Sequence, residues 1–341
     1  MLKYRNTAIK LNNLEEFMLI TQEEYDRLLK GFYINGVAIR DTGYVCFTAR
    51  EKRGDIDPVF QEPLALKKFV TYFYDEPLGE QWGAATYEGM DKLISVTTTI
   101  PLSQYIGIDM GGQVYVLGSG VECLEDDIPG EHTIFGARTI GGKAYVTGGG
   151  RYVARRINPN VWEILRKGIK KPTREEHLYT AGFDCVDGFS ETDIYAGGGK
   201  GDLWHFNGET WKQISFPNSI YIESICCGGD GYVYIGAQSG MVFKGRDQQW
   251  VTISQGGLSL PFRQMVWYQD RIWATSDYGV WHIYNDEVIT AELPDEVRMC
   301  SGYICCNDKT LVIAGLYGAA RLENGKWDIL VNCIQAEKTS E

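Results

Sequence analysis

The sequence lacks the long apolar runs and the excess of positive charge that mark several classes of protein. No stretch of its 341 residues approaches the roughly 18 consecutive apolar residues of a membrane span. The start, MLKYRNTAIKLNNLEEF, has no apolar segment of the kind found in secretory signals. Lysine and arginine number 33 against 45 aspartates and glutamates, a net charge of −12 that argues against general binding to nucleic acid or anionic membranes. We therefore expect a cytoplasmic protein that binds neither.

Metal ligands in a recognisable spacing are also absent. The nine cysteines form no C-x-x-C pair and sit in apolar runs such as those around Cys46 and Cys226, so we expect free buried thiols. There are four histidines, and His205 and His282 stand at equivalent positions of different repeats, where they cannot share a metal ion. The sequence predicts no metal and no cofactor.

Glycines and aromatic residues are abundant instead, and they recur at regular spacing. The 40 glycines and 21 tyrosines favour turns and β-strands over helix bundles. Similar segments of the type VYIGAQSG start at Val114, Ala144, Ile194, Val233, Ile272 and Leu311. The last four starts are 39 residues apart, whereas the step from Ala144 to Ile194 is 50 residues and contains an insertion. A fixed period near 40 indicates a fold of stacked units.

Each late repeat is predicted to contain four short strands. In residues 221–254, apolar runs alternate with turns that contain glycine or polar residues, as in an antiparallel meander. Four such strands per repeat resemble the blades of a β-propeller, and residues 130–334 are similar to degenerate kelch-like and bacterial WD40-like propellers. The resemblance implies an all-β propeller with four-stranded antiparallel blades. It has seven blades if residues 36–50 and 82–99 supply two earlier ones, and six otherwise.

The propeller is expected to span residues 32–334. Residues 1–31 precede it and are expected to provide a strand and a short helix that pack on the ring. A propeller is a closed ring, and one blade is often completed by a strand from the other end of the chain. Residues 6–11, NTAIKL, are a candidate for that strand.

Two segments depart from the β pattern. Residues 13–32 are predicted to be helical, and Thr21 and Glu24 have the spacing of a capping box, in which each residue caps the backbone of the other. The tail, residues 335–341, is short and polar, and we expect it to be disordered.

The segment GGGKGD at residues 197–202 has the composition of a phosphate-binding loop, but not its pattern. A P-loop needs a serine or threonine after the lysine and a glycine six residues before it, whereas Lys200 is followed by Gly201 and preceded at that distance by Ile194. The glycine also recurs seven residues after each of the last four repeat starts, at Gly201, Gly240, Gly279 and Gly318. We interpret it as a turn position that requires a positive φ.

Ionisable residues of a propeller channel are expected where the innermost strands begin. The residues ten positions before the last four repeat starts are Asp184, Glu223, Phe262 and Ser301. Arg263 and Arg298 lie close by, so Asp184, Glu223 and the two arginines are predicted to converge, and two carboxylates could do acid–base work there. The alternative is that they are solvated or salt-bridged. Because Phe262 and Ser301 do not complete a catalytic set, we expect no enzyme activity.

The turns beside the repeated glycine vary between repeats, which is how a rigid ring acquires a specific binding face. We predict partner contacts at Lys200, Gln238, Asp277, Tyr278 and Tyr317. Residues 151–174, which begin with Arg151, are rich in arginine and lysine and include the insertion. This segment is either a binding element or a solvated loop. The acidic residues 122–131 are a candidate site for a basic partner.

The chain resembles the propeller proteins that serve as cognate immunity proteins beside secreted bacterial toxins. This resemblance implies a non-catalytic, monomeric protein that binds a toxin domain and neutralises it. Two alternatives remain, a hydrolase or lyase with its site at the channel mouth and a regulatory scaffold. The predicted partner-binding residues are Arg151, Asp184, Lys200, Glu223, Gln238, Arg263, Asp277, Tyr278 and Tyr317.

Overall fold

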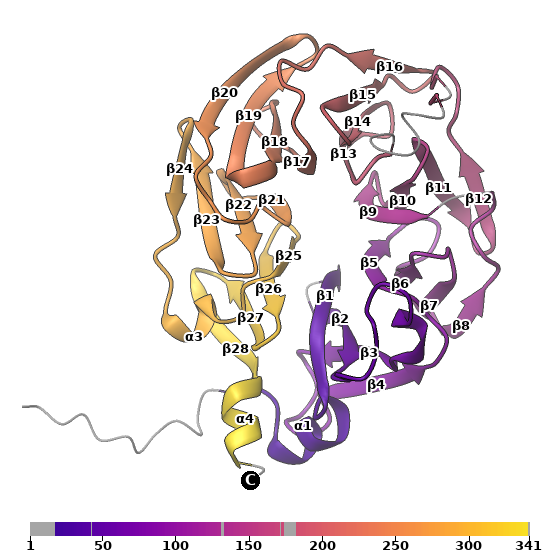
Figure 1. Cartoon of the computed structure of the whole chain (residues 1–341). Helices are drawn as coiled ribbons and strands as arrows, with labels where there is room; N and C mark the ends of the chain where they lie inside the picture. The colour runs from indigo at the N-terminus through magenta and orange to yellow at the C-terminus, as the bar shows by residue number, and fades with distance from the viewer. Residues whose placement is uncertain (1–17, 42, 131–132, 171, 174–181, 340–341) are drawn as a thin grey trace, which may run out of the picture.

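The chain folds into a ring of seven four-stranded antiparallel sheets, or blades (Figure 1). The structure is a computed structural model, which describes residues 18–41, 43–130, 133–170, 172–173 and 182–339. Each blade consists of four strands that are consecutive in the chain. The predicted all-β propeller and its seven blades are therefore confirmed.

Within every blade the strands run in chain order from the centre of the ring outward. Blades 1 and 2 contain β1 (Phe32–Asp41), β2 (Tyr44–Glu51), β3 (Lys67–Phe73), β4 (Trp82–Tyr87), β5 (Leu93–Thr98), β6 (Gln104–Asp109), β7 (Val114–Gly118) and β8 (Val121–Glu125). Blades 3 and 4 contain β9 (Ile134–Ile140), β10 (Lys143–Gly148), β11 (Tyr152–Asn158), β12 (Val161–Ile164), β13 (Cys185–Ser190), β14 (Asp193–Gly198), β15 (Asp202–Phe206) and β16 (Trp211–Ile214). Blades 5 and 6 contain β17 (Ile222–Cys227), β18 (Val233–Ala237), β19 (Met241–Arg246), β20 (Gln249–Gln255), β21 (Gln264–Tyr268), β22 (Arg271–Ser276), β23 (Gly279–Tyr284) and β24 (Glu287–Thr290). Blade 7 contains β25 (Tyr303–Cys306), β26 (Thr310–Gly315), β27 (Gly318–Glu323) and β28 (Lys326–Asn332).

The helices are short and lie between or beyond the strands. In the described part of the chain they are α1 (Gln22–Leu28), the 3-10 turns η1 (Glu62–Leu64) and η2 (Gln238–Gly240), α3 (Asp295–Arg298) and α4 (Cys333–Thr339). Among the described residues, no helix is long and apolar enough to cross a membrane.

Packing between blades explains why the repeats are seen in the sequence as apolar runs rather than as alternating patterns. The second strands are covered on both faces by neighbouring blades, and in β14 every residue from Ile194 to Gly198 is buried. A strand that is buried on both faces has no polar face, so its residues form a continuous apolar run. The second strands are therefore the part of each blade that makes the repeat recognisable in the sequence.

One of the six similar segments occupies a different place in its blade from the other five. The segment that starts at Val114 forms β7 and β8, the outer pair of blade 2, whereas the other five repeat starts lie in second strands. Its hairpin has a similar glycine turn, and such a pattern does not encode the distance of a strand from the ring axis. Residues 36–50 lie in blade 1, and residues 82–99 run from the last strand of blade 1 into the first strand of blade 2.

The repeated glycine is a conformational requirement in most of the late blades. Gly201 and Gly240 both have φ of +73°, and Gly318 has φ of +149°. At Gly201 an added Cβ would also lie 2.2 Å from the carbonyl oxygen of Asn218, so the turn excludes a side chain. Gly279 does not have a positive φ, so the prediction was wrong there. In that blade, Asp277 and Tyr278 form a two-residue turn between Ser276 and Gly279, which pair across the hairpin.

No strand is shared between the ends of the ring among the described residues. Blade 1 packs directly against blade 7. Residues just before α1 add a single bridge to the outer edge of blade 7, where the amide of Leu19 donates to the carbonyl oxygen of Ile329 at 3.2 Å. The predicted closing strand, residues 6–11, lies outside the described residues.

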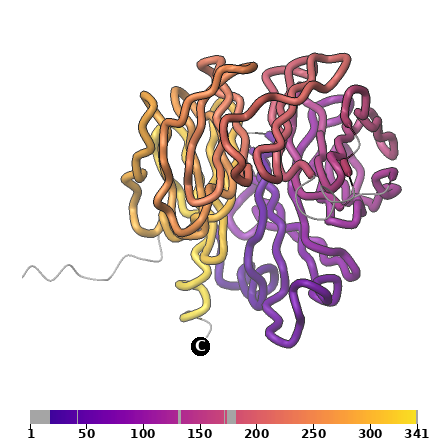
Figure 2. The backbone as a smooth tube through the Cα atoms, turned by 45° about the horizontal axis from the view of Figure 1, so that its top comes forward, coloured from indigo at the N-terminus to yellow at the C-terminus, as the bar shows by residue number. Residues whose placement is uncertain are grey.

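Helices α1 and α4 lie side by side across this closure (Figures 1 and 2). The predicted capping box is present, because the amide of Glu24 donates to Oγ1 of Thr21 at 3.2 Å and the amide of Thr21 donates to Oε2 of Glu24 at 2.9 Å. The helix itself is shorter than the predicted 13–32. Residues 335–339, expected in a disordered tail, instead lie in α4. Its Ala336 is fully buried in the hydrophobic cluster that joins blades 1 and 7.

The two faces of the ring carry different connections. Because the strands alternate in direction, the first strands begin on the same face as the turns between second and third strands. We call this the channel-mouth face. The turns between first and second strands, and between third and fourth strands, lie on the opposite face. Hydrogen bonds agree with this assignment, since the amide of Gln238, after β18, donates to the carbonyl oxygen of Tyr221, before β17, at 3.0 Å.

Candidate functional site

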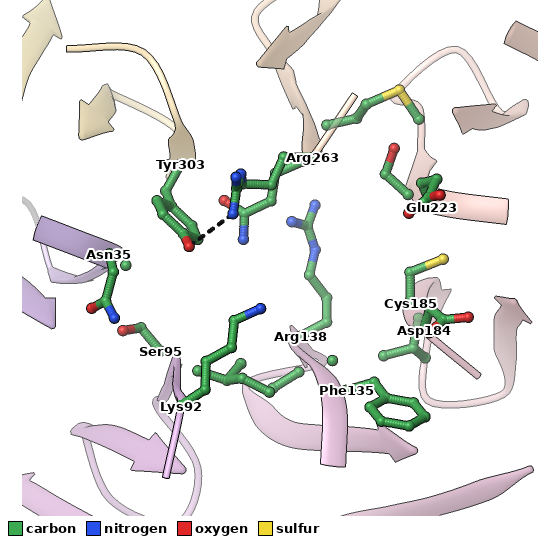
Figure 3. Close-up of a pocket in the computed structure, with 18 of the residues that line it drawn as sticks. Asn35, Lys92, Ser95, Phe135, Arg138, Asp184, Cys185, Glu223, Arg263 and Tyr303 are labelled. Atoms are coloured by element: carbon green, nitrogen blue, oxygen red, sulfur yellow. Dashed lines mark hydrogen bonds between the residues drawn. The ribbon is translucent and has the colours of Figure 1, made fainter. Parts of the chain in front are cut away.

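The first strands of all seven blades enclose a polar cavity at the channel-mouth face. Its volume is about 490 Å³. The charged and polar residues that line it include Asn35, Lys92, Ser95, Arg138, Asp184, Glu223, Arg263 and Tyr303 (Figure 3), together with Asp277. The propeller thus brings side chains from distant parts of the chain around one axis.

One wall of the cavity is acidic. Asp184 and Glu223 come from the starts of blades 4 and 5 and lie next to each other in Figure 3. Burial raises the pKa of Asp184, although the amide of Gly199 donates to its Oδ2 at 3.3 Å and opposes this shift. Burial and then the charge of Asp184 raise the pKa of Glu223. Among the described residues, neither carboxylate has an ion pair, so together they can hold a cation or exchange protons.

Cationic side chains from three other blades point into the same cavity. Figure 3 shows Lys92, Arg138 and Arg263 directed towards its centre. Arg138 forms a bidentate ion pair with Asp187, at 3.1 and 3.2 Å. Lys92 is exposed and makes no ion pair with any described residue. The cations therefore differ, because the charge of Arg138 is already balanced whereas that of Lys92 is not.

Arg263 is held by two neighbours on the same side of the channel. It forms an ion pair with Asp277 at 2.6 Å, and its guanidinium donates to the hydroxyl of Tyr303 at 2.9 Å. Its Nε is buried and has no hydrogen-bond partner in the described residues. The structure therefore places Asp184, Glu223 and Arg263 around one cavity, as the spacing from the repeat starts predicts. Arg298 does not join them, because it lies in α3 and pairs with the exposed Asp295 at 2.6 Å.

The predicted variable turns also lie on the channel-mouth face. Lys200, Gln238 and Tyr278 are exposed in blades 4, 5 and 6, and Tyr317 is exposed in blade 7. Asp277 is half-buried because it pairs with Arg263. These side chains lie on the same face as the mouth of the cavity, and Asp277 lines the cavity itself, so one molecule could contact several of them together.

Arg151, a predicted partner contact, is buried in an ion pair between two blades. Its side chain is 7% exposed, and its Nε donates to Oδ2 of the equally buried Asp202 at 2.6 Å. Asp202 belongs to the next blade, and its Oδ1 accepts a hydrogen bond from Nε1 of Trp204 at 2.8 Å. Arg151 therefore joins blades 3 and 4. The sequence shows its charge but not the buried carboxylate that it faces.

Other charges of the predicted basic and acidic segments neutralise each other. Arg156 and Glu125 form a buried ion pair between blades 3 and 2, with one contact of 3.1 Å from Nε. Arg155 pairs with Glu163 and Glu191. Residue 171 and residues 174–181 of the insertion lie outside the described part of the chain. Much of the charge in these segments thus serves blade packing.

Several channel residues were missed by sequence reasoning. Asn35, Lys92 and Arg138 lie in the first strands of blades 1 to 3, or just before them, where the repeat is too degenerate to count back from a start. Tyr303 lies two residues after the predicted Ser301, which is buried. Phe262, also predicted to lie at the mouth, is fully buried as well. The sequence signal for such a channel residue is a charged side chain in or just before the first strand of a blade. It can be used only where the start of that blade is known.

The geometry defines the class of the protein as a seven-bladed β-propeller with a polar central channel. No protein-family profile matches the chain. The chain is similar to the immune protein Tsi7 of Pseudomonas aeruginosa, with 29% identity over 213 residues that cover 60% of this chain and 69% of Tsi7.

Solved structures share the fold at low sequence identity. The WD40 β-propeller domain of Doa1 matches with a TM-score of 0.56 and 10% identity, and the match covers 88% of this chain and 97% of that domain. Selenomethionine-substituted virginiamycin B lyase from Staphylococcus aureus matches with a TM-score of 0.55 and 11% identity, over 71% of this chain and 85% of the lyase. At these identities the likeness extends to the fold alone.

Proposed function

We propose that the chain is a non-catalytic immunity protein that binds a cognate toxin and neutralises it. The similarity to the immune protein Tsi7 carries this proposal. A rigid ring whose turns vary from blade to blade is consistent with it, because such a surface can be specific for one partner without carrying out a reaction. The protein acts as a monomer in the cytoplasm of the bacterium that makes the toxin.

Exposed apolar side chains favour the channel-mouth face as the toxin-binding surface. Phe60, Tyr278 and Val59 are the most exposed large apolar side chains of the described residues, at 83%, 78% and 75%. All three lie on connections between second and third strands, and Leu316 and Tyr317 occupy the corresponding turn of blade 7. Exposed aromatic side chains on rigid turns often dominate protein interfaces. Lys200 and Gln238 remain proposed contacts on the same face.

The role is tested by isolating the partner and measuring its toxicity. The tagged full-length chain is purified from its native host, and each protein that stays bound is identified by mass spectrometry. We expect one partner that stops growth when it is expressed alone and does not when this chain is co-expressed. If the bound protein is harmless, or if co-expression does not restore growth, the immunity role is wrong.

The binding face is tested with matched tyrosine variants and that partner. Tyr278→Ser with Tyr317→Ser removes two exposed tyrosines from the channel-mouth face. Tyr232→Ser with Tyr284→Ser removes two from the opposite face, and Tyr232 at 47% is a close match in exposure to Tyr317 at 50%. We expect the first pair to weaken binding at least ~30-fold, which corresponds to the loss of one hot spot of about 2 kcal/mol. Equal effects of the two pairs would exclude this face.

A further inference from the structure

The cavity contains groups of both charges whose bonding capacity is not used within the described chain. Among the described residues, Glu223 has neither an ion pair nor a hydrogen bond, and Asp184 accepts one hydrogen bond, from the amide of Gly199. In the same part of the chain, the buried Oδ1 of Asn35 has no donor, and the buried Nε of Arg263 has no acceptor. Lys92 makes no ion pair with any residue that the structure describes. Unused donors and acceptors in a shared polar cavity are groups that a polar ligand can satisfy.

These groups are separated across the channel. Asp184 and Glu223 lie in blades 4 and 5, whereas Lys92 precedes the first strand of blade 2 (Figure 3). In a ring of seven, blade 2 faces blades 5 and 6 across the axis. A ligand that meets both walls must therefore carry a cationic group at one end and an anionic group at the other.

The charge balance narrows the class of ligand. Arg138 is neutralised by Asp187, and Arg263 is neutralised by Asp277. Lys92 then contributes one positive charge against two carboxylates, Asp184 and Glu223, so the site has one negative charge in excess when both are ionised. A ligand with two cationic groups and one carboxylate matches this balance. The cavity, at about 490 Å³, lies within the range of small-molecule sites.

We propose that the central channel is a binding site for a small zwitterion with the chemistry of a basic amino acid. Asp184 and Glu223 hold its cationic groups, and Lys92 holds its carboxylate. This site is independent of the proposed immunity role, because a small ligand inside the channel requires no protein partner.

The probes are two basic amino acids and two analogues of lysine that each lack one of its charged groups. L-Lysine and L-arginine carry two cationic groups and a carboxylate, cadaverine lacks the carboxylate, and norleucine lacks the side-chain ammonium. Calorimetric titration of the full-length chain near neutral pH is expected to give saturable binding of L-lysine or L-arginine. We expect at least tenfold weaker binding of cadaverine and norleucine than of L-lysine.

Three variants test which residues hold the two ends of the ligand, and a fourth variant is the control. Asp184→Asn and Glu223→Gln should each weaken the binding of the basic amino acid at least tenfold. Lys92→Met should weaken that binding but leave cadaverine unchanged, because cadaverine has no carboxylate for Lys92 to hold. Asp295→Asn alters an exposed carboxylate that pairs with Arg298 outside the cavity and should change nothing. Thermal unfolding of each variant confirms that the ring is intact.

Other results would overturn the proposal. If neither amino acid gives saturable heat at millimolar concentration, the channel does not bind this class of ligand. If cadaverine binds as tightly as L-lysine, the site recognises cations alone and Lys92 has no role in it. If Glu223→Gln binds the amino acids as the wild-type chain does, the acidic wall does not contact them.

Discussion

Replacement of Arg151 by alanine is expected to destabilise the ring without affecting a partner. The substitution removes the guanidinium that pairs with Asp202 and leaves that carboxylate buried beside Trp204. Removing one member of a buried ion pair costs about 3–5 kcal/mol, because the remaining charge loses its compensation without regaining water. Asp202 keeps its hydrogen bonds from Trp204 and Gln213, at 2.8 and 3.2 Å. The expected loss therefore lies at the lower end, about 3 kcal/mol.

The loss is measured by urea unfolding, followed through tryptophan fluorescence. A shift of the midpoint at constant slope gives the change in the free energy of unfolding. The control is Arg53→Ala, which breaks an exposed ion pair with Asp55 and should leave the unfolding midpoint nearly unchanged. A double variant, Arg151→Met with Asp202→Asn, should recover part of the loss, since no charge is left unpaired.

Two results would contradict a structural role for Arg151 and favour the partner contact that its basic sequence context predicts. If Arg151→Ala unfolds within about 1 kcal/mol of the wild-type chain, the pair with Asp202 contributes no more than an exposed one. If that variant also weakens binding of the toxin, the side chain is a contact residue and the account of the interface between blades 3 and 4 is wrong.

Three further predictions concern titratable groups. Asp184→Asn with Glu223→Gln should raise the free energy of unfolding at pH 7. The raised pKa values of Asp184 and Glu223 mean that the folded state binds protons more readily than the unfolded state, so the stability gained by the double variant should shrink from pH 7 towards pH 4. A gain in stability that does not depend on pH would contradict this prediction. Burial and the charge of Arg271 lower the pKa of His282, so the free energy of unfolding should fall from pH 7 to pH 5 as the unfolded state takes up the proton more readily. His282→Phe should reduce this fall, which is measured by urea unfolding at the two pH values. Burial raises the pKa of eight thiols, those of Cys46, Cys185, Cys226, Cys227, Cys300, Cys305, Cys306 and Cys333, which slows their labelling. Cys123 lies half-buried in β8, the outermost strand of blade 2, so Cys123→Ser should abolish the fast phase of thiol labelling in the native chain. A persistent fast phase would point to another reactive thiol.

The spacing of the repeats was sufficient to predict the fold, because each blade buries the same strands in the same way. The apolar second strands and the turn at Gly201 recur for a physical reason, namely burial on both faces and a backbone that excludes a side chain. The first two blades were harder to place. Their strands have similar lengths, but the hairpin at Val114 looks the same whether it lies near the axis or at the rim.

The candidate site was predictable only where the register was known. Counting from the repeat starts located Asp184 and Glu223, yet the same count placed the buried Phe262 at the mouth. Whether a charged side chain is free or paired depends on residues about fifty positions away, as Arg151 and Asp202 illustrate. No local pattern contains that information, so the sequence could not separate binding residues from those that hold blades together.

The arrangement of each blade as one uninterrupted stretch of chain has a consequence for synthesis. As the chain leaves the ribosome, blades can form in order from the first to the sixth, but the ring has no closing partner until the last strands appear. During this time the inner faces of blade 1, with Val37 and Phe47, lack the apolar residues of blade 7 that finally cover them, among them Val312 and Val331. The nascent protein therefore exposes apolar surface at both ends of the incomplete ring, and its risk of misassembly is greatest just before blade 7 emerges.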